Sequence, residues 1–417
     1  MRKVKLKVSS LWILFSLVAL TMSTSLLSPL ASATDKKQPE PGWLSDGKLY
    51  LNFRYRYEFV DQDGFAKDAH ASTLRTRLAY QSPYYSNFGF LLELDDVRPI
   101  GADLYNSTRN GNRNRPVVAD PEGTEVNQAQ ILYSGVENTV IRVGRQRITL
   151  DNHRHIGNVG WRQNGQTYDG FSISNSSLPK TNIAYAYIEN VNRIVGPDSG
   201  TPPANLGSDS HILNLKHEWS PNWDVAAYAY LLDLENSPLL SNRTFGLRIK
   251  GSLAINDSTS TNYTIEYAHQ MNYGDNPNNY NANYFLLEGA LTTGGITGKL
   301  GYEVLEGDPT QAFQTPLATL HAFQGWADKF VATPSVGIED LYFSIATQIH
   351  GANTSVVYHR FEPETGGPIF GSELDVSVKR PFADHYSIEF KYANYNARGF
   401  SVDTEKLWIL FTAEFGN

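Results

Sequence analysis

Apolar and polar residues alternate with a period of two along most of this 417-residue chain. The clearest case is the segment 48–59, in which every second residue is a leucine, a phenylalanine or a tyrosine. The intervening positions carry Arg54, Arg56 and Glu58. Because successive side chains of a β-strand point to opposite faces, this segment predicts a strand with one apolar face and one charged face.

Eighteen strand-like segments follow one another from residue 48 to residue 415. We expect strands near residues 48–59, 72–81, 88–97, 126–134, 139–147, 166–174, 181–190, 210–219, 223–235, 243–254, 262–270, 281–292, 295–305, 337–350, 354–362, 373–379, 386–394 and 404–415. The spacers alternate between short turns, such as 220–222 and 351–353, and long polar loops, such as 98–125 and 306–336. An even strand count and this loop rhythm are typical of bacterial outer-membrane barrels. The pattern predicts an all-β fold: a transmembrane antiparallel β-barrel of about eighteen strands, with short periplasmic turns and long extracellular loops.

A soluble β-sandwich would also show alternation, so the charged faces decide between the two folds. Charged residues oppose apolar ones on many strands, and in a barrel they would line a wet lumen. In the segment 227–235, the apolar set is Tyr228, Tyr230, Leu232 and Leu234, opposite Ala227, Ala229, Asp233 and Glu235. The sandwich does not explain so many strands with a charged face, and the barrel does.

The first 33 residues have the three parts of a secretory signal peptide. Four basic residues within the first seven precede the apolar run Leu11 to Leu20, and Ala31-Ser32-Ala33 provides a cleavage site. The apolar run is too short for a membrane-spanning helix of about 20 residues. We therefore expect a signal peptide at 1–33, a periplasmic N-terminal segment at 34–47 and the barrel at 48–417.

Composition narrows the classes of function. Without the four basic residues of the signal peptide, 31 of the 35 Lys and Arg residues remain against 43 acidic ones, a net charge of −12. Such a chain has no electrostatic reason to bind nucleic acid. The absence of cysteine excludes a disulfide framework, a thiol nucleophile and a thiolate metal site. No long apolar segment follows residue 33, which excludes helical membrane spans.

Two stretches of sequence resemble the alginate export family of outer-membrane proteins. The first includes Gly144-Arg145-Gln146-Arg147, Asp151-Asn152-His153-Arg154-His155-Ile156-Gly157, Trp161-Arg162-Gln163-Asn164 and Tyr168-Asp169-Gly170. The second runs from Thr315 to Phe330. The resemblance covers nearly the whole mature chain and implies an eighteen-stranded outer-membrane channel. Members of the family range from the exporter of alginate, a linear polyuronate, to channels of unassigned substrate.

The likeness to the exporter itself is partial. The family's exporter has a strongly cationic constriction and long segments that plug both mouths of the pore. This chain has a long loop at 98–125, which carries Arg109, Arg113 and Arg115. Its last periplasmic turn, 380–385, is too short to form a plug.

Basic and acidic residues share the polar faces of the predicted strands and the adjoining loop. The candidate pore-lining or substrate-contacting residues are Arg54, Arg56, Glu58, Arg75, Arg77, Glu93, Asp95, Arg142, Arg145, Arg147, Arg154, Arg162, Arg248, Lys250, Glu266, Lys299 and Glu303. A ring of guanidinium groups would attract carboxylates and bind them through paired hydrogen bonds. Alternatively, the same cations pair with lumen acids and only satisfy one another. The sequence leaves both interpretations open and predicts a moderately anion-selective pore.

Two loops carry unusual residue combinations. His153 and His155 could chelate a metal, but Arg154 between them would repel a cation. We therefore expect no metal or cofactor, and we expect the loop 150–165 to fold inward and narrow the pore. The loop 306–336 mixes apolar residues with His321 and Asp328. It would form either a lid against the mouth or wall of the barrel, or a self-packed loop at the cell surface.

The sequence therefore favours an outer-membrane channel, or porin, for anionic or polar solutes, which include uronate-type saccharides such as alginate. An outer-membrane enzyme, phospholipase-like, would need a Ser–His or acid–His pair, and no such spacing accompanies His217, His269, His350 or His359. A structural surface barrel would have longer and more repetitive loops. The expected partners are outer-membrane lipid and lipopolysaccharide, the β-barrel assembly machinery, and small solutes or saccharides, with a monomer favoured over a trimer.

Overall fold

A computed structural model describes residues 46–416 of the chain. The strands are β1 (Lys48–Gln62), β2 (Ala69–Gln81), β3 (Phe88–Pro99), β4 (Gly123–Tyr133), β5 (Thr139–Gln146), β6 (Thr167–Asn175), β7 (Thr181–Asn192), β8 (Asn205–Ser220), β9 (Trp223–Leu232), β10 (Asn242–Asn256), β11 (Thr259–Asn272), β12 (Asn281–Thr293), β13 (Ile296–Leu305), β14 (Ile338–Ile349), β15 (Ala352–Glu362), β16 (Gly371–Phe382), β17 (Tyr386–Ala397) and β18 (Thr404–Gly416). The expected signal peptide at 1–33 and most of the segment 34–47 lie outside the described residues.

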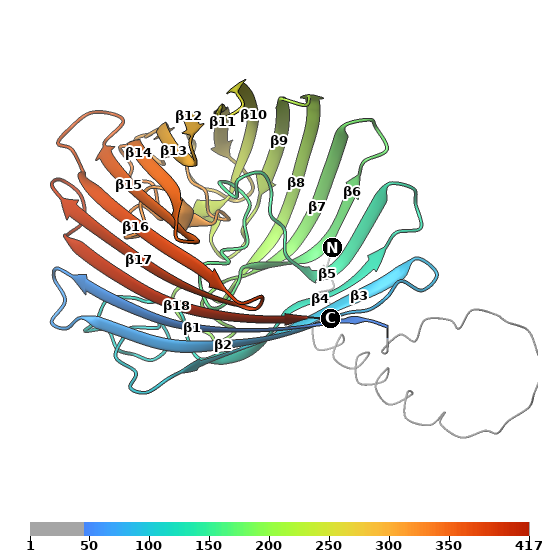
Figure 1. Cartoon of the computed structure of the whole chain (residues 1–417), viewed down its shortest axis with the longest axis horizontal. Helices are drawn as coiled ribbons and strands as arrows, with labels where there is room; N and C mark the ends of the chain where they lie inside the picture. The colour runs from blue at the N-terminus through green and yellow to red at the C-terminus, as the bar shows by residue number, and fades with distance from the viewer. Residues whose placement is uncertain (1–45, 417) are drawn as a thin grey trace, which may run out of the picture. The chain divides into compact units, whose positions relative to one another are not determined.

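The eighteen strands form one closed antiparallel sheet (Figure 1). Each strand pairs with the strands before and after it in sequence, and β1 also pairs with β18. Closure leaves no sheet edge with unpaired backbone groups, as a lipid environment requires. Two one-turn 3-10 helices, Pro238–Leu240 and Leu320–Ala322, interrupt the connections. No helix among residues 46–416 has the length and hydrophobicity to span a membrane.

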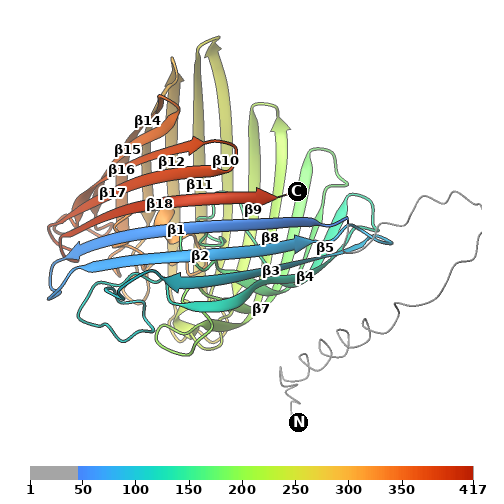
Figure 2. The ribbon, with the colours of Figure 1, turned by 60° about the horizontal axis from the view of Figure 1, so that its bottom comes forward.

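Every strand predicted from the alternation is present, with boundaries that differ by a few residues. The largest difference is in β8, which begins at Asn205 instead of residue 210. The long connections 100–122, 147–166, 193–204 and 306–337 all follow odd-numbered strands and therefore leave the same end of the barrel. Figure 2 shows the loop 100–122 at the same end as the β1–β2 connection. The predicted fold class and loop rhythm are confirmed.

The outward face of the barrel is apolar. In the middle of strands β10 to β14, the outward positions hold Leu247, Ile265, Leu287, Leu300 and Phe343, which are 41–58% exposed. A continuous band of exposed leucine, isoleucine and phenylalanine would cost free energy in water and is stable against lipid. The band is therefore the membrane-facing surface.

The alternation in the segment 227–235 has the opposite orientation. Its apolar set faces the lumen, because Tyr228 lies opposite Gly246 and Tyr230 lies opposite Thr244, beside the lumen-facing Arg248. Tyr228 is buried, and its Oη forms a hydrogen bond of 3.0 Å with Nε2 of His155 in the loop 147–166. The loop covers this part of the inner wall and excludes water from it, so the apolar rings of the tyrosines can face inward. The usual assignment of the apolar face to the membrane is wrong for this strand.

Candidate functional site

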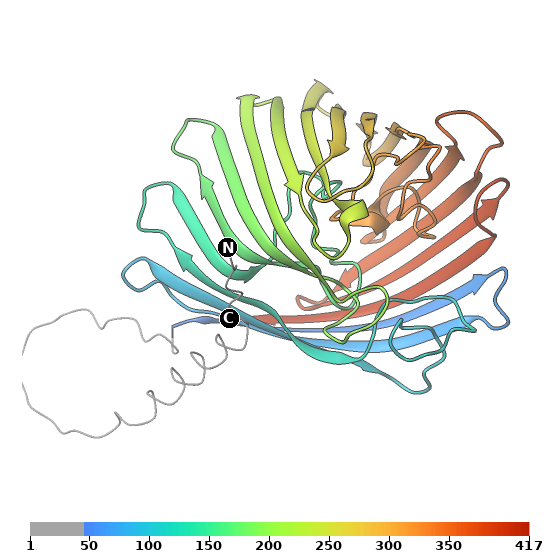
Figure 3. The same cartoon turned by 180° about the vertical axis from the view of Figure 1, so that it is seen from behind.

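The loop 147–166 crosses the lumen of the barrel. On one side, Arg54 Nε of β1 donates a hydrogen bond to Gln163 Oε1 at 3.0 Å. On the other side, His155 Nε2 lies 3.3 Å from Glu266 Oε1 of β11. In a ring of eighteen strands, β1 and β11 are almost diametrically opposed. The loop therefore folds inward, as its sequence predicts, and Figures 1 and 3 show chain inside the ring of strands.

The loop 306–337 lies beside the first loop within the barrel. Gly157 N donates to Leu317 O at 2.8 Å, and Thr319 N donates to His153 O at 3.0 Å. At the wall, Ala327 N donates to Glu373 Oε1 of β16 at 2.6 Å. The sequence left open whether this loop packs against the barrel or only on itself at the cell surface. In the structure, the loop packs against the inner wall of the barrel. The two loops together form the constriction of the lumen.

Buried ions join the constriction to the wall at β1 and β18. Arg162 lies 3.0 Å from Glu58 and 3.4 Å from Asp328 (N to O distances). Asp328 also accepts a hydrogen bond from Lys406 Nζ at 2.8 Å. Burial would lower the pKa of Arg162, but Glu58, Asp120 and Asp328 outweigh it and raise this pKa above its usual value. The network therefore stays charged and binds both loops to the wall.

An aromatic cage surrounds a lysine next to this network. Lys391 Nζ of β17 lies 3.9 Å from the ring centre of Trp161 and 3.8 Å from that of Trp326, each on a different loop. Trp408 of β18 is 5.6 Å away, and His321 Nε2 accepts a hydrogen bond from Nζ at 2.8 Å. Indole faces attract cations, more strongly when water is excluded. The cage was not predicted from the sequence, because its members come from four separate segments.

Arg54 and Arg75 are the two guanidinium groups at the constriction that have no acidic partner. They lie opposite each other on β1 and β2. No carboxylate of residues 46–416 comes within 4.0 Å of either group. Arg54 donates to Gln163 and to the backbone oxygen of Gly160, and Arg75 donates to Asn52. Neutral acceptors satisfy some of their hydrogen bonds, and Arg75 is buried. Asp120 acts on Arg54, and Asp95 and Glu93 act on Arg75, from beyond 4.0 Å, so within the described residues neither charge is compensated by a direct ion pair.

Most of the other predicted pore-lining cations are paired. The pairs are Arg56 with Glu58, Arg77 with Glu93 and Asp95, Arg147 with Glu93, Arg154 with Glu303, Arg248 with Glu266, and Lys299 with Glu288. Arg142 and Lys250 lie on lumen-facing positions without an acid within 4.0 Å among the described residues. Arg145 lies on the opposite face of β5 from Arg142 and pairs with Asp169 at 2.8 Å. Both interpretations of the basic residues are therefore represented, each by different residues.

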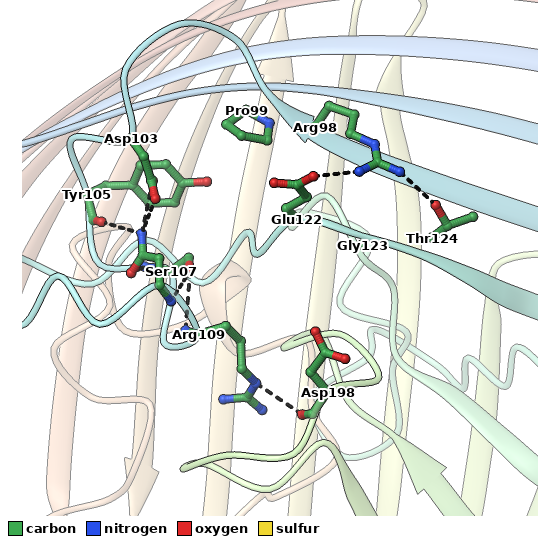
Figure 4. A pocket seen from close by; sticks show the side chains of 11 residues that line it. Arg98, Pro99, Asp103, Tyr105, Ser107, Arg109, Glu122, Gly123, Thr124 and Asp198 are labelled. Atoms are coloured by element: carbon green, nitrogen blue, oxygen red, sulfur yellow. Dashed lines mark hydrogen bonds and ion pairs between the residues drawn. The ribbon is translucent and has the colours of Figure 1, made fainter.

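A cavity of about 440 Å³ lies at the end of the barrel that carries the long loops (Figure 4). The loop 100–122 and the ends of β3 and β4 line it, together with Asp198 of the loop 193–204. Arg109 joins the two loops by donating to the backbone oxygens of Asp198 at 3.1 Å and Pro202 at 2.8 Å. Arg98 lies 2.5 Å from Glu122. Arg98 therefore joins β3 to the loop 100–122, and Arg109 joins the loop 100–122 to the loop 193–204.

The structure places the two histidines of the loop 147–166 differently from a metal site. His155 is buried between Tyr228 and Glu266. In the described part of the chain, His153 and His155 do not converge with a third histidine or acid on a possible metal position. Within residues 46–416, no group of three or more histidine, aspartate or glutamate side chains is placed to hold a metal ion.

The closed barrel, its apolar outer band and the charged lumen define an outer-membrane channel. The alginate export family model matches residues 47–315, and the chain belongs to this family. A search of curated protein sequences gives no match.

Solved structures of porins have the same fold. OccK9 (OpdG) of Pseudomonas aeruginosa has a TM-score of 0.73 and 13% identity, and covers 90% of this chain and 100% of its own. OccAB2 of Acinetobacter baumannii has a TM-score of 0.71 and 17% identity, with the same coverage. OpdK of Pseudomonas aeruginosa, crystallised with vanillate, has a TM-score of 0.71, 13% identity and the same coverage. At these identities, the likeness concerns the fold.

Proposed function

We propose that the channel conducts small solutes that carry a carboxylate, among them monomeric or short uronate-type saccharides, past Arg54 and Arg75. The observation that carries this proposal is the pair of adjacent guanidinium groups without an acidic partner. A guanidinium group matches a carboxylate in shape and charge and can form two parallel hydrogen bonds with it. The vanillate found with OpdK also carries one carboxylate, which supports this class of solute.

Small solutes suit the constriction better than a polymer chain does. Two loops cross or enter the lumen and are fixed by buried ion pairs and backbone hydrogen bonds. A long polyuronate would need a continuous open path. We therefore favour passage of small anions over export of alginate.

The proposal includes the surroundings of the channel. The apolar outer band would lie in the outer membrane, bordered by lipid and lipopolysaccharide. The β-barrel assembly machinery would insert the chain after cleavage of the signal peptide near Ala33. The barrel would act as a monomer; a single chain closes its own lumen, so conduction would need no second copy.

Uptake into liposomes tests the proposed solute class. Glucuronate and glucose have the same ring and differ by one carboxylate, so their comparison isolates the charge. At low ionic strength, we expect labelled glucuronate to enter liposomes containing the protein faster than glucose does. The preference should weaken as salt shortens the Debye length from about 30 Å at 0.01 M to about 10 Å at 0.1 M. Equal rates for the two solutes, or faster entry of glucose, would contradict the proposal.

A further inference from the structure

Asp328 lies where the loop 306–337 meets three other parts of the molecule. Its carboxylate accepts a hydrogen bond from Lys406 Nζ of β18 at 2.8 Å and lies 3.4 Å from Arg162 Nη2 of the loop 147–166. It also contacts His321 Nδ1 at 2.8 Å, and His321 Nε2 in turn contacts Lys391 Nζ of β17 at 2.8 Å. One carboxylate therefore connects both loops and two strands of the wall.

The protonation states of this cluster follow from its surroundings. Burial would raise the pKa of Asp328, but Lys406, His321 and Arg162 outweigh it and hold this pKa well below its usual range. Burial, followed by the charge of Lys391, lowers the pKa of His321 to about 3. Neutral His321 therefore donates from Nδ1 to Asp328 and accepts at Nε2 from Lys391. In this way the charge of Asp328 acts on Lys391 through the imidazole ring.

Among residues 46–416, Asp328 is the one carboxylate within ion-pair distance of Lys406. Lys391 has no carboxylate within 4.0 Å in the same part of the chain, and Glu389, Asp375 and Asp328 act on it from farther away. Both lysine side chains are buried. The remaining hydrogen bonds between this part of the loop and the wall run from Trp326 N and Ala327 N to acids of β16. Asp328 is thus the negative charge that the loop supplies to the basic side of the wall.

We infer that Asp328 fastens the loop 306–337, and through Arg162 the loop 147–166, across the lumen, and so sets the width and the charge of the pore. An uncompensated buried charge is costly, so loss of this carboxylate would favour solvation of Lys391 and Lys406. Solvation requires the loop to leave the wall. The pore would then become wider and more strongly basic. This role requires that the barrel conducts ions, and it does not depend on the proposed preference for carboxylates.

Asp328→Asn tests the inference because the side chain keeps its shape and loses its charge. We expect higher single-channel conductance and a shift of the reversal potential toward anions. The matched control is Asp308→Asn in the same loop, because the Asp308 carboxylate is half-buried and accepts hydrogen bonds from Thr310, Gln311 and the backbone of Asn281, with no basic partner within 4.0 Å among the described residues. The control should conduct like the unaltered protein.

Movement of the loop can be measured separately from charge. The chain has no cysteine, so Ala318→Cys introduces a single thiol at a buried position of the loop. Adding Asp328→Asn should accelerate maleimide labelling of this thiol by about 100-fold or more, because breaking a buried ion pair on one side is strongly destabilising. Unchanged conductance and unchanged labelling would overturn the inference. So would a selectivity shift without faster labelling, because the role would then be electrostatic only.

If Asp328→Asn fails to insert into the membrane, a second variant can still test the inference. Lys406→Met keeps Asp328 and removes its shortest ion pair with the wall. We expect a smaller rise in conductance and in labelling than in the aspartate variant, and no rise in either would refute the inference. If the liposome assay shows no carboxylate preference while these variants still widen the pore, the proposed solute class fails and the role of Asp328 stands.

Discussion

Replacing Arg54 and Arg75 together by glutamine is expected to lower the anion-to-cation permeability ratio about tenfold, since each 1.4 kcal/mol corresponds to a factor of ten. A unit charge 4 Å away contributes about 4 kcal/mol at an effective dielectric constant of 20. Loss of part of this attraction is therefore sufficient for the expected change. The effect should be large because neither charge has an acid within 4.0 Å among the described residues, whereas Arg77 and Arg248 are paired. Reversal potentials in asymmetric potassium chloride would measure it.

A matched control separates local charge from total charge. Arg243 and Arg360 lie on outward-facing positions of β10 and β15, so their double replacement by glutamine removes the same two charges outside the lumen. This control should keep the selectivity of the unaltered protein. If both double variants changed selectivity equally, the position of Arg54 and Arg75 at the constriction would have no special role.

Arg154→Met is expected to lower the free energy of unfolding by about 3–5 kcal/mol, the usual cost of leaving one buried ion unpaired. Arg154 is 1% exposed, and its Nε donates to Glu303 Oε1 at 2.7 Å. It also donates to Thr315 at 3.0 Å and Gln324 at 3.1 Å, both on the loop 306–337. The substitution therefore loosens the contact of both loops with β13. Urea unfolding in detergent, followed by tryptophan fluorescence, would measure the loss.

The double variant Arg154→Met with Glu303→Met provides the control for this prediction. Replacing both members of a buried ion pair by apolar groups is often close to neutral, because no charge is then left unpaired. We expect the double variant to recover most of the stability lost in the single variant. A double variant less stable than Arg154→Met would contradict the account, since it would mean that Glu303 stabilises the barrel independently of Arg154.

The strands were predictable from sequence because their signal is local. A period of two and a turn every few residues are enough to locate all eighteen, and closure is expected because lipid leaves no partner for an open sheet edge. The orientation of β9 was not predictable in this way. The rule that apolar residues face lipid fails where a loop covers the inner wall, as His155 covers Tyr228. Only the tertiary structure shows which part of the lumen is dry.

The constriction was predicted in part. Inward folding of the loop near residues 150–165 and a basic wall were both expected, but the pairing of each cation depends on distances between segments far apart in sequence. The position of Trp408 in the sequence could have indicated a covered part of the inner wall. It occupies the polar face of the last strand, in phase with Lys406, where a tryptophan is unexpected in a wet lumen. Its presence there indicates a wall position that protein covers.

The reversal potential of the unaltered protein in a planar bilayer under a potassium chloride gradient tests the central claim most directly. In the described part of the chain, Arg54 and Arg75 have no acid within 4.0 Å at the constriction, where the other charges are largely paired. The account predicts ion conductance with a moderate preference for chloride over potassium, which weakens as salt screens the arginines. Preference for potassium, or no conductance, would contradict it.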